Sequence, residues 1–133
     1  MSGYSGTSLV DKLGIKAGMR VHFANMPPDY FRTLGRTPTV VLMTKVKAPL
    51  DFVQYFARSR AELEKQMPPF VEALTPDGML WVSWPKQASK VETDLTEDVV
   101  RGIALANGLV DVKVCAVDEV WSGLKLVRRL KDR

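Results

Sequence analysis

Residues 78–85 are the stretch that most constrains the fold of this chain. They read Gly-Met-Leu-Trp-Val-Ser-Trp-Pro, an uncharged run rich in apolar and aromatic side chains. Turn-forming residues, Thr75-Pro76-Asp77, precede the run, and a proline closes it. A short apolar run of this kind between two helical patterns is typical of a parallel strand that is covered on both faces. The loop that begins at Pro85 is then expected at the carboxyl edge of the sheet, where open α/β sheets bind ligands.

The rest of the chain supplies further strands and helices for such a sheet. Alternating or β-forming patterns predict strands at residues 19–24, 39–44, 50–57, 79–84, 110–117 and 124–129. Helical spacing predicts helices near residues 9–13, 27–35, 59–74 and 94–107. Pro68-Pro69 is expected to kink or split the third helix, and Asp94 is expected to cap the fourth with Glu97. This order predicts a single-domain, three-layer, Rossmann-like α/β fold. Its sheet is mostly parallel, with a C-terminal antiparallel hairpin at one edge.

Length and composition place the chain among globular proteins. It has 133 residues, of which 46% are hydrophobic and 26% charged, enough for one buried core. We expect a flexible arm over residues 1–7 and one domain over residues 8–133. The polar start and the lack of an apolar run of about 20 residues predict a cytoplasmic protein without a membrane segment.

The charge and the cysteine content limit the kinds of partner and chemistry expected for this chain. The net charge is +4, and the basic residues are scattered except near the C-terminus, which is expected to be a solvated tail. No nucleic-acid partner is therefore expected. The single cysteine, Cys115, lies in an alternating apolar stretch and is expected to be a buried, inert thiol.

The element order resembles that of the S-adenosylmethionine-dependent methyltransferases. That resemblance implies a glycine-rich turn after the first strand and an acidic residue after the second. No glycine lies between Gly18 and Gly35, and Pro27-Pro28 stands in the place of the turn. Residues 44–47 read Thr-Lys-Val-Lys, without a carboxylate. We therefore expect no bound cofactor of the usual type.

The chain also resembles a family of small bacterial proteins of unknown function. Seven segments carry this resemblance: residues 4–7, 13–16, 59–63, 76–86, 94–101, 108–115 and 121–125. The family implies no activity that can be carried over.

The candidate ligand site is the carboxyl edge that follows the fourth strand. Indole rings, a lysine and carboxylates near one edge are suited to a small polar pocket with an aromatic wall. The candidate residues are Trp84, Lys86, Asp94, Thr96, Glu97, Asp118, Glu119 and Trp121. The alternative for each is structural: Asp94 and Thr96 cap a helix, the indoles fill the core, and Lys86 solvates a loop. Trp84-Pro85 is also a candidate cis peptide.

No catalytic set or metal site is predicted. His22, the only histidine, is expected to be a packed and hydrogen-bonded core residue rather than a base. Ser83, His22 and Asp94 together supply the residue types of a hydrolase triad, but no Gly-x-Ser-x-Gly elbow surrounds the serine. The chain has no cluster of cysteine and histidine with zinc-ligand spacing.

These observations lead to two functional hypotheses. The first is a non-catalytic binding or protein-interaction module that has lost the glycine-rich cofactor loop, with a homodimer through the sheet edge or hairpin. The alternative is a methyltransferase-like enzyme or sensor that binds a small molecule at the carboxyl edge of the sheet.

Overall fold

The computed structural model describes residues 7–133, so all but the last residue of the predicted N-terminal arm lies outside the described residues. The helices are α1 (Leu9–Leu13), α2 (Tyr30–Leu34), α3 (Arg60–Ala73) and α4 (Glu97–Ala106), with short 3-10 turns η1 (Gln87–Ser89) and η2 (Leu130–Asp132). The strands are β1 (Arg20–Ala24), β2 (Val41–Leu42), β3 (Leu50–Phe56), β4 (Leu74–Pro85), β5 (Leu109–Ala116) and β6 (Trp121–Arg128). No helix among these residues is long and apolar enough to cross a membrane.

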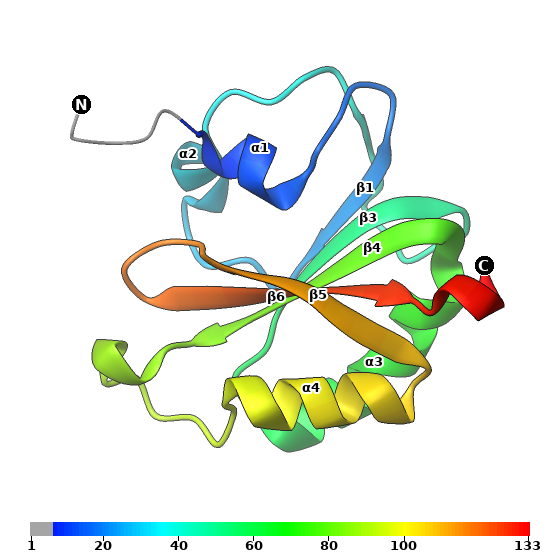
Figure 1. Cartoon of the computed structure of the whole chain (residues 1–133). Coiled ribbons are helices and arrows are strands. Elements are labelled where there is room, and N and C mark those ends of the chain that lie inside the picture. The colour runs from blue at the N-terminus through cyan, green and yellow to red at the C-terminus, as the bar shows by residue number, and fades with distance from the viewer. Residues whose placement is uncertain (1–6) are drawn as a thin grey trace.

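All six strands belong to one mixed sheet of order β2-β1-β3-β4-β6-β5. The first four strands are parallel, and β6 is antiparallel to both β4 and β5. Helices α1 and α2 lie on one face and α3 and α4 on the other (Figure 1). The predicted fold class, with its antiparallel hairpin at one edge, is therefore confirmed.

The apolar run identified in the sequence forms the centre of this sheet. Its residues alternate between the two cores: Trp81 packs on the α1 side, whereas Leu80 and Val82 pack on the α3 side. The indole nitrogen of Trp81 donates a hydrogen bond to the Leu13 carbonyl at 2.8 Å, which attaches α1 to the sheet. The parallel neighbour β3 brings the end of β4 to the same edge as the end of β1.

Several local predictions are corrected. The second strand is only two residues long, although backbone bonds from Val41 to Met19 and from Met43 to Val21 extend its contact with β1. Helix α3 runs unbroken through Pro68 and Pro69, because both rings face solvent and water can bond the two carbonyls that lose their donors. The described cis peptide bond is Ala48-Pro49, and Trp84-Pro85 is trans.

The cap of α4 also differs from the prediction. Thr96, not Asp94, is the N-cap, and its hydroxyl accepts a hydrogen bond from the Val99 amide at 3.2 Å. Asp94 accepts instead from the Arg60 amide in the first turn of α3, at 2.8 Å. The carboxylate therefore satisfies a free amide of the neighbouring helix.

Candidate ligand-binding site

The structure divides the eight predicted site residues into two groups. Trp84, Lys86, Thr96 and Glu97 line a small pocket of 190 Å³ between the end of β4 and the start of α4. Within it, Trp84 is 5% exposed and belongs to the core, Thr96 caps α4, and Glu97 forms an ion pair with Arg101. Most of the polar groups at this edge are thus already bonded within the protein.

The other four predicted residues do not line that pocket. Asp94 bonds α3, and Asp118 accepts hydrogen bonds from the amides of Val120 and Trp121, both at 2.8 Å. Trp121 is buried, with its ring 5.1 Å from that of Phe56 and the Arg58 guanidinium 5.2 Å above it. Glu119 is exposed. A ligand site at this edge stays a prediction, and it uses at most half of the predicted set.

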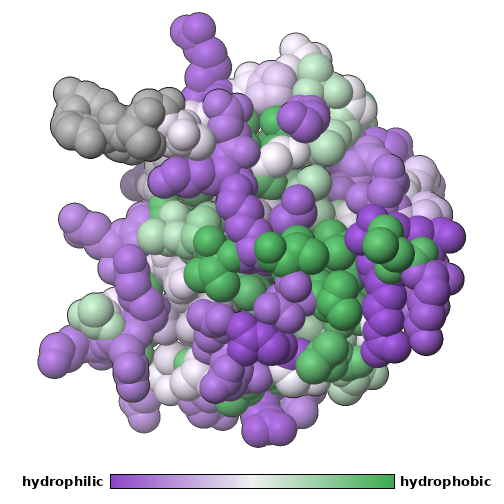
Figure 2. Space-filling model, in the orientation of Figure 1, coloured by the Kyte–Doolittle hydropathy of each residue, from purple (hydrophilic) through white to green (hydrophobic). Residues whose placement is uncertain are grey.

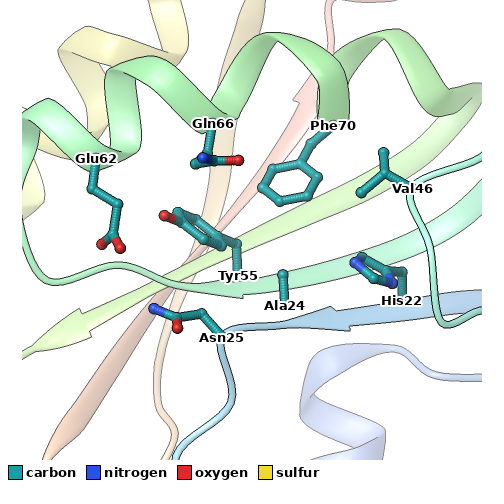
Figure 3. A pocket seen from close by; sticks show the side chains of 8 residues that line it. All are labelled: His22, Ala24, Asn25, Val46, Tyr55, Glu62, Gln66 and Phe70. Atoms are coloured by element: carbon teal, nitrogen blue, oxygen red, sulfur yellow. The ribbon is translucent and has the colours of Figure 1, made fainter.

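A larger pocket, of 330 Å³, opens beside the carboxyl ends of β1 and β3. We call it the His22–Glu62 pocket. It lies under α3, which contributes three of its side chains (Figure 3). Its lining consists of His22, Ala24, Asn25, Val46, Tyr55, Glu62, Gln66 and Phe70.

The hydrogen bond of His22 defines its tautomer. Nδ1 lies 2.8 Å from the carbonyl oxygen of Met43, which can only accept, so Nδ1 carries the proton. In the neutral ring Nε2 is then an acceptor, and it makes no hydrogen bond to residues 7–133. The prediction of a buried, hydrogen-bonded histidine is confirmed, but the same ring also lines a pocket.

The hydroxyl of Tyr55 is a buried polar group without a hydrogen-bond partner among the described residues. Its hydroxyl is buried and meets no hydrogen-bonding group at normal distance within the described residues. Burial, then the charge of the nearby Glu62 carboxylate, and then an interaction of the hydroxyl with this carboxylate beyond normal hydrogen-bonding distance raise the pKa of this phenol above its ordinary value. In Figure 3 the hydroxyl points along the pocket toward Glu62, with Gln66 on the helix above it. A buried hydroxyl without a partner is costly, and a ligand in this pocket would satisfy it.

The Glu62 carboxylate accepts one hydrogen bond from the protein backbone and can accept more. Its Oε1 accepts from the Arg58 amide at 3.0 Å, while Ser59 caps the Glu62 amide at 3.2 Å, completing the predicted capping box. No lysine or arginine of residues 7–133 forms an ion pair with this carboxylate. Sequence reasoning assigned Glu62 to the cap alone, since a capping box carries no sign of what lies beside it.

The hydrolase-like set is not assembled. The Ser83 hydroxyl is fully buried and lies 3.1 Å from the Gln54 amide nitrogen, which donates to it, and Gln54 in turn accepts from Tyr30 at 2.7 Å. His22 and Asp94 are bonded elsewhere. Among the described residues no group of three metal-ligating side chains comes together either.

Comparison with known proteins supports the fold. No family model matches the chain, and no curated protein matches it. The resemblance to a family of small bacterial proteins of unknown function therefore stays a prediction. Among solved structures, a putative type 11 methyltransferase from Sulfolobus solfataricus superposes with a TM-score of 0.64 at 14% identity, covering 91% of this chain and 89% of that chain.

Two further structures have the same architecture. Magnesium protoporphyrin IX methyltransferase from Synechocystis PCC 6803, solved with bound SAM, has a TM-score of 0.59 at 13% identity, covering 91% and 74% of the two chains. A SAM-dependent methyltransferase from Aquifex aeolicus has a TM-score of 0.57 at 16% identity, covering 89% and 86%.

The residues that would hold S-adenosylmethionine in the usual way do not fit it. The turn after β1 is made by Asn25, at φ 60°, and its side-chain nitrogen donates to the Phe56 carbonyl at 2.7 Å. Pro27 and Pro28 offer no amide to a carboxylate or hydroxyl, and no acidic residue follows β2. The cofactor loop of the fold is thus replaced by a turn that closes on the protein itself.

The comparisons correct the first functional hypothesis. A non-catalytic module was inferred from the missing glycine loop, but the structural neighbours are S-adenosylmethionine-dependent methyltransferases, some solved with SAM or SAH. They favour the alternative hypothesis over the first. The chain has a methyltransferase-like Rossmann fold.

Proposed function

We propose that this protein is a small-molecule-binding enzyme or sensor whose ligand occupies the His22–Glu62 pocket. One observation carries the proposal: the buried Tyr55 hydroxyl and the free Nε2 of His22 line one pocket at the carboxyl ends of β1 and β3. Open α/β sheets bind ligands at this edge, and buried polar atoms without partners are uncommon except where a ligand or water supplies them.

The pocket provides binding groups and one basic atom. Tyr55, Asn25 and Gln66 can form hydrogen bonds to a ligand, while Phe70 and Val46 supply apolar contact. The unprotonated Nε2 of His22 can accept a proton from a ligand held within hydrogen-bonding reach. For a ligand that is a substrate, we therefore assign His22 the role of general base.

A thermal-shift screen with variants tests the proposal. The panel contains S-adenosylmethionine, S-adenosylhomocysteine, nucleosides, amines and common metabolites. A ligand at about 100 times its dissociation constant should raise stability by about 2.7 kcal/mol. Ala24→Leu, which fills the pocket from β1, should abolish the shift, and Ala24→Ser, which leaves it open, should retain it.

The same screen separates the two pockets. A stabilising ligand whose effect survives Ala24→Leu but is lost in Lys86→Ala would place the site at the end of β4 and overturn the proposal. Each variant is compared with its own ligand-free melting temperature, so a loss of intrinsic stability does not mimic a loss of binding.

A homodimer and a cytoplasmic location stay predictions. The free edge strand β5 exposes Val112 and Val114, and Figure 2 shows a band of apolar side chains across the face where Figure 1 places this strand. This edge supports the prediction of a homodimer through the hairpin.

A further inference from the structure

The His22–Glu62 pocket has an unusual balance of charge. The chain has a net charge of +4, yet its lining includes one carboxylate and no lysine or arginine. The Glu62 carboxylate is half-buried and is not neutralised by an ion pair within residues 7–133. A partly desolvated carboxylate attracts a cation, and it would repel a phosphate or a carboxylate group.

The hydrogen-bonding groups of the lining also favour a cationic ligand that donates hydrogen bonds. An ionised glutamate can only accept, and the Nδ1–H tautomer of His22 leaves Nε2 as an acceptor. The amide nitrogen of Asn25 donates to the Phe56 carbonyl, and its Oδ1 is an acceptor that makes no hydrogen bond within residues 7–133. Tyr55 and Gln66 also carry donors, but Glu62, His22 and Asn25 each offer an acceptor, which suits a ligand that donates hydrogen bonds.

The position of the carboxylate sets the orientation of such a ligand. Figure 3 shows Glu62, Asn25 and the Tyr55 hydroxyl toward one end of the pocket and His22 and Val46 toward the other. Phe70, whose ring centroid is 5.1 Å from that of Tyr55 and 6.3 Å from that of His22, forms an apolar wall between them. A cationic head at the Glu62 end would leave an apolar or weakly polar body along Phe70 and Val46.

We propose that the ligand of this pocket is an organic amine, bound as its ammonium ion with Glu62 as counter-ion. This inference rests on the proposed function and adds the chemical class of the ligand. The ammonium group donates to the free Glu62 oxygen and to the Tyr55 hydroxyl oxygen, and the body of the ligand packs on Phe70.

Three probes with one carbon skeleton test the charge requirement. Cyclohexylmethylamine, cyclohexylmethanol and cyclohexanecarboxylate are titrated at pH 7 into ¹⁵N-labelled full-length protein, and binding is followed by NMR. The amine should bind about tenfold more tightly than the alcohol, as expected for a hydrogen bond to a charged group in a partly buried site. The carboxylate should bind most weakly.

Glu62→Gln removes the charge while preserving the helix cap. A glutamine oxygen still accepts from the Arg58 amide, so α3 keeps its capping box. This variant should bind the amine about tenfold more weakly than wild type, with the affinity for the alcohol unchanged. Glu64→Gln is the matched control, because Glu64 is exposed on the same helix and pairs with Arg60; it should change neither affinity.

The outcomes separate this inference from the proposed function. Tighter binding of the alcohol or the carboxylate, with shifts at Asn25 and Gln66, would overturn the amine while supporting the pocket. An amine affinity that is unchanged in Glu62→Gln, or no binding of the amine at millimolar concentration, would also overturn it. Shifts confined to the residues around Trp84 and Lys86 would overturn both proposals.

Discussion

Two buried tyrosines, Tyr30 of α2 and Tyr55 of β3, lie in the cores on opposite faces of the sheet and differ in how their hydroxyls are bonded. The Tyr30 hydroxyl donates to Gln54 at 2.7 Å and completes a chain to Ser83 inside the core. The Tyr55 hydroxyl is equally buried but has no ordinary partner among the described residues. The first side chain is explained by the fold, whereas the second leaves a hydroxyl that a ligand or water in the pocket would satisfy.

Removing each hydroxyl should therefore have different effects. Tyr30→Phe leaves the Gln54 oxygen without its donor and should destabilise the protein by about 1–3 kcal/mol. Tyr55→Phe removes a hydroxyl that makes no hydrogen bond at normal distance within residues 7–133, so its free energy of unfolding should stay within about 0.5 kcal/mol of wild type or rise. Urea unfolding of both variants at neutral pH measures the difference, and an equal loss in the two would contradict this account.

The stability of the protein at alkaline pH provides a second test of the two buried tyrosines. Burial is the main reason that the pKa values of both phenols are raised, and the charge of Glu62 adds to the effect at Tyr55. The unfolded chain then loses these protons first, so stability is complete below about pH 10 and falls above it. The slope should be about 1.4 kcal/mol per pH unit for each tyrosine, and each Phe variant should remove one such contribution.

At the level of elements, two glycines have opposite roles. A Cβ on Gly123 of β6 would lie 3.2 Å from the Trp81 ring and 3.3 Å from Val117, so this strand approaches the indole closely. A Cβ on Gly102 of α4 would meet nothing within 4 Å. The first glycine is needed for packing, and the second, at an exposed position, lowers the stability of α4.

Alanine substitution should therefore change stability in opposite directions. Gly123→Ala should cost about 1–3 kcal/mol through overpacking against Trp81. Gly102→Ala should add about 0.5–1 kcal/mol by lowering the entropy of the unfolded chain and improving helix propensity. Thermal melting of the two variants beside wild type is sufficient, and destabilisation by Gly102→Ala would show that α4 packs more tightly than described.

The elements were largely predictable from the sequence, because they depend on local pattern. The run at β4, the capping box at Ser59 and the glycine stops were sufficient to define the sheet and its helices. The prediction failed where context decides the outcome. The two prolines of α3 are tolerated since their rings face solvent, and Asp94 caps the neighbouring helix rather than its own.

At the level of the whole molecule, the predicted site and the proposed one lie at the same carboxyl edge. Sequence reasoning found the edge through the strand with the strongest signal, β4, and named the polar residues that follow it. The proposed pocket lies instead across β1, β3 and α3, which come together only in the folded sheet. His22 was identified but assigned to the core, since one residue's spacing does not reveal the cavity beside it.

The fold resembles that of methyltransferases, whereas the loop after β1 lacks the features of their cofactor site. The architecture is that of the methyltransferases, with TM-scores up to 0.64 among the structures compared. The turn at Asn25 and the two prolines after it, however, do not offer the usual cofactor site. Under the proposed function, the small molecule is therefore held at the same sheet edge without the usual cofactor loop.

The single histidine of the chain allows the most direct test of the central claim, that a ligand binds in the His22–Glu62 pocket. The ring nitrogens of His22 are followed by ¹⁵N NMR while the ligand found in the thermal-shift screen is added. The account predicts the Nδ1–H tautomer in the free protein. It also predicts a saturable change in the Nε2 chemical shift, with the same dissociation constant as that obtained from thermal stabilisation. A ligand that stabilises the protein but leaves both ring nitrogens unchanged would contradict it.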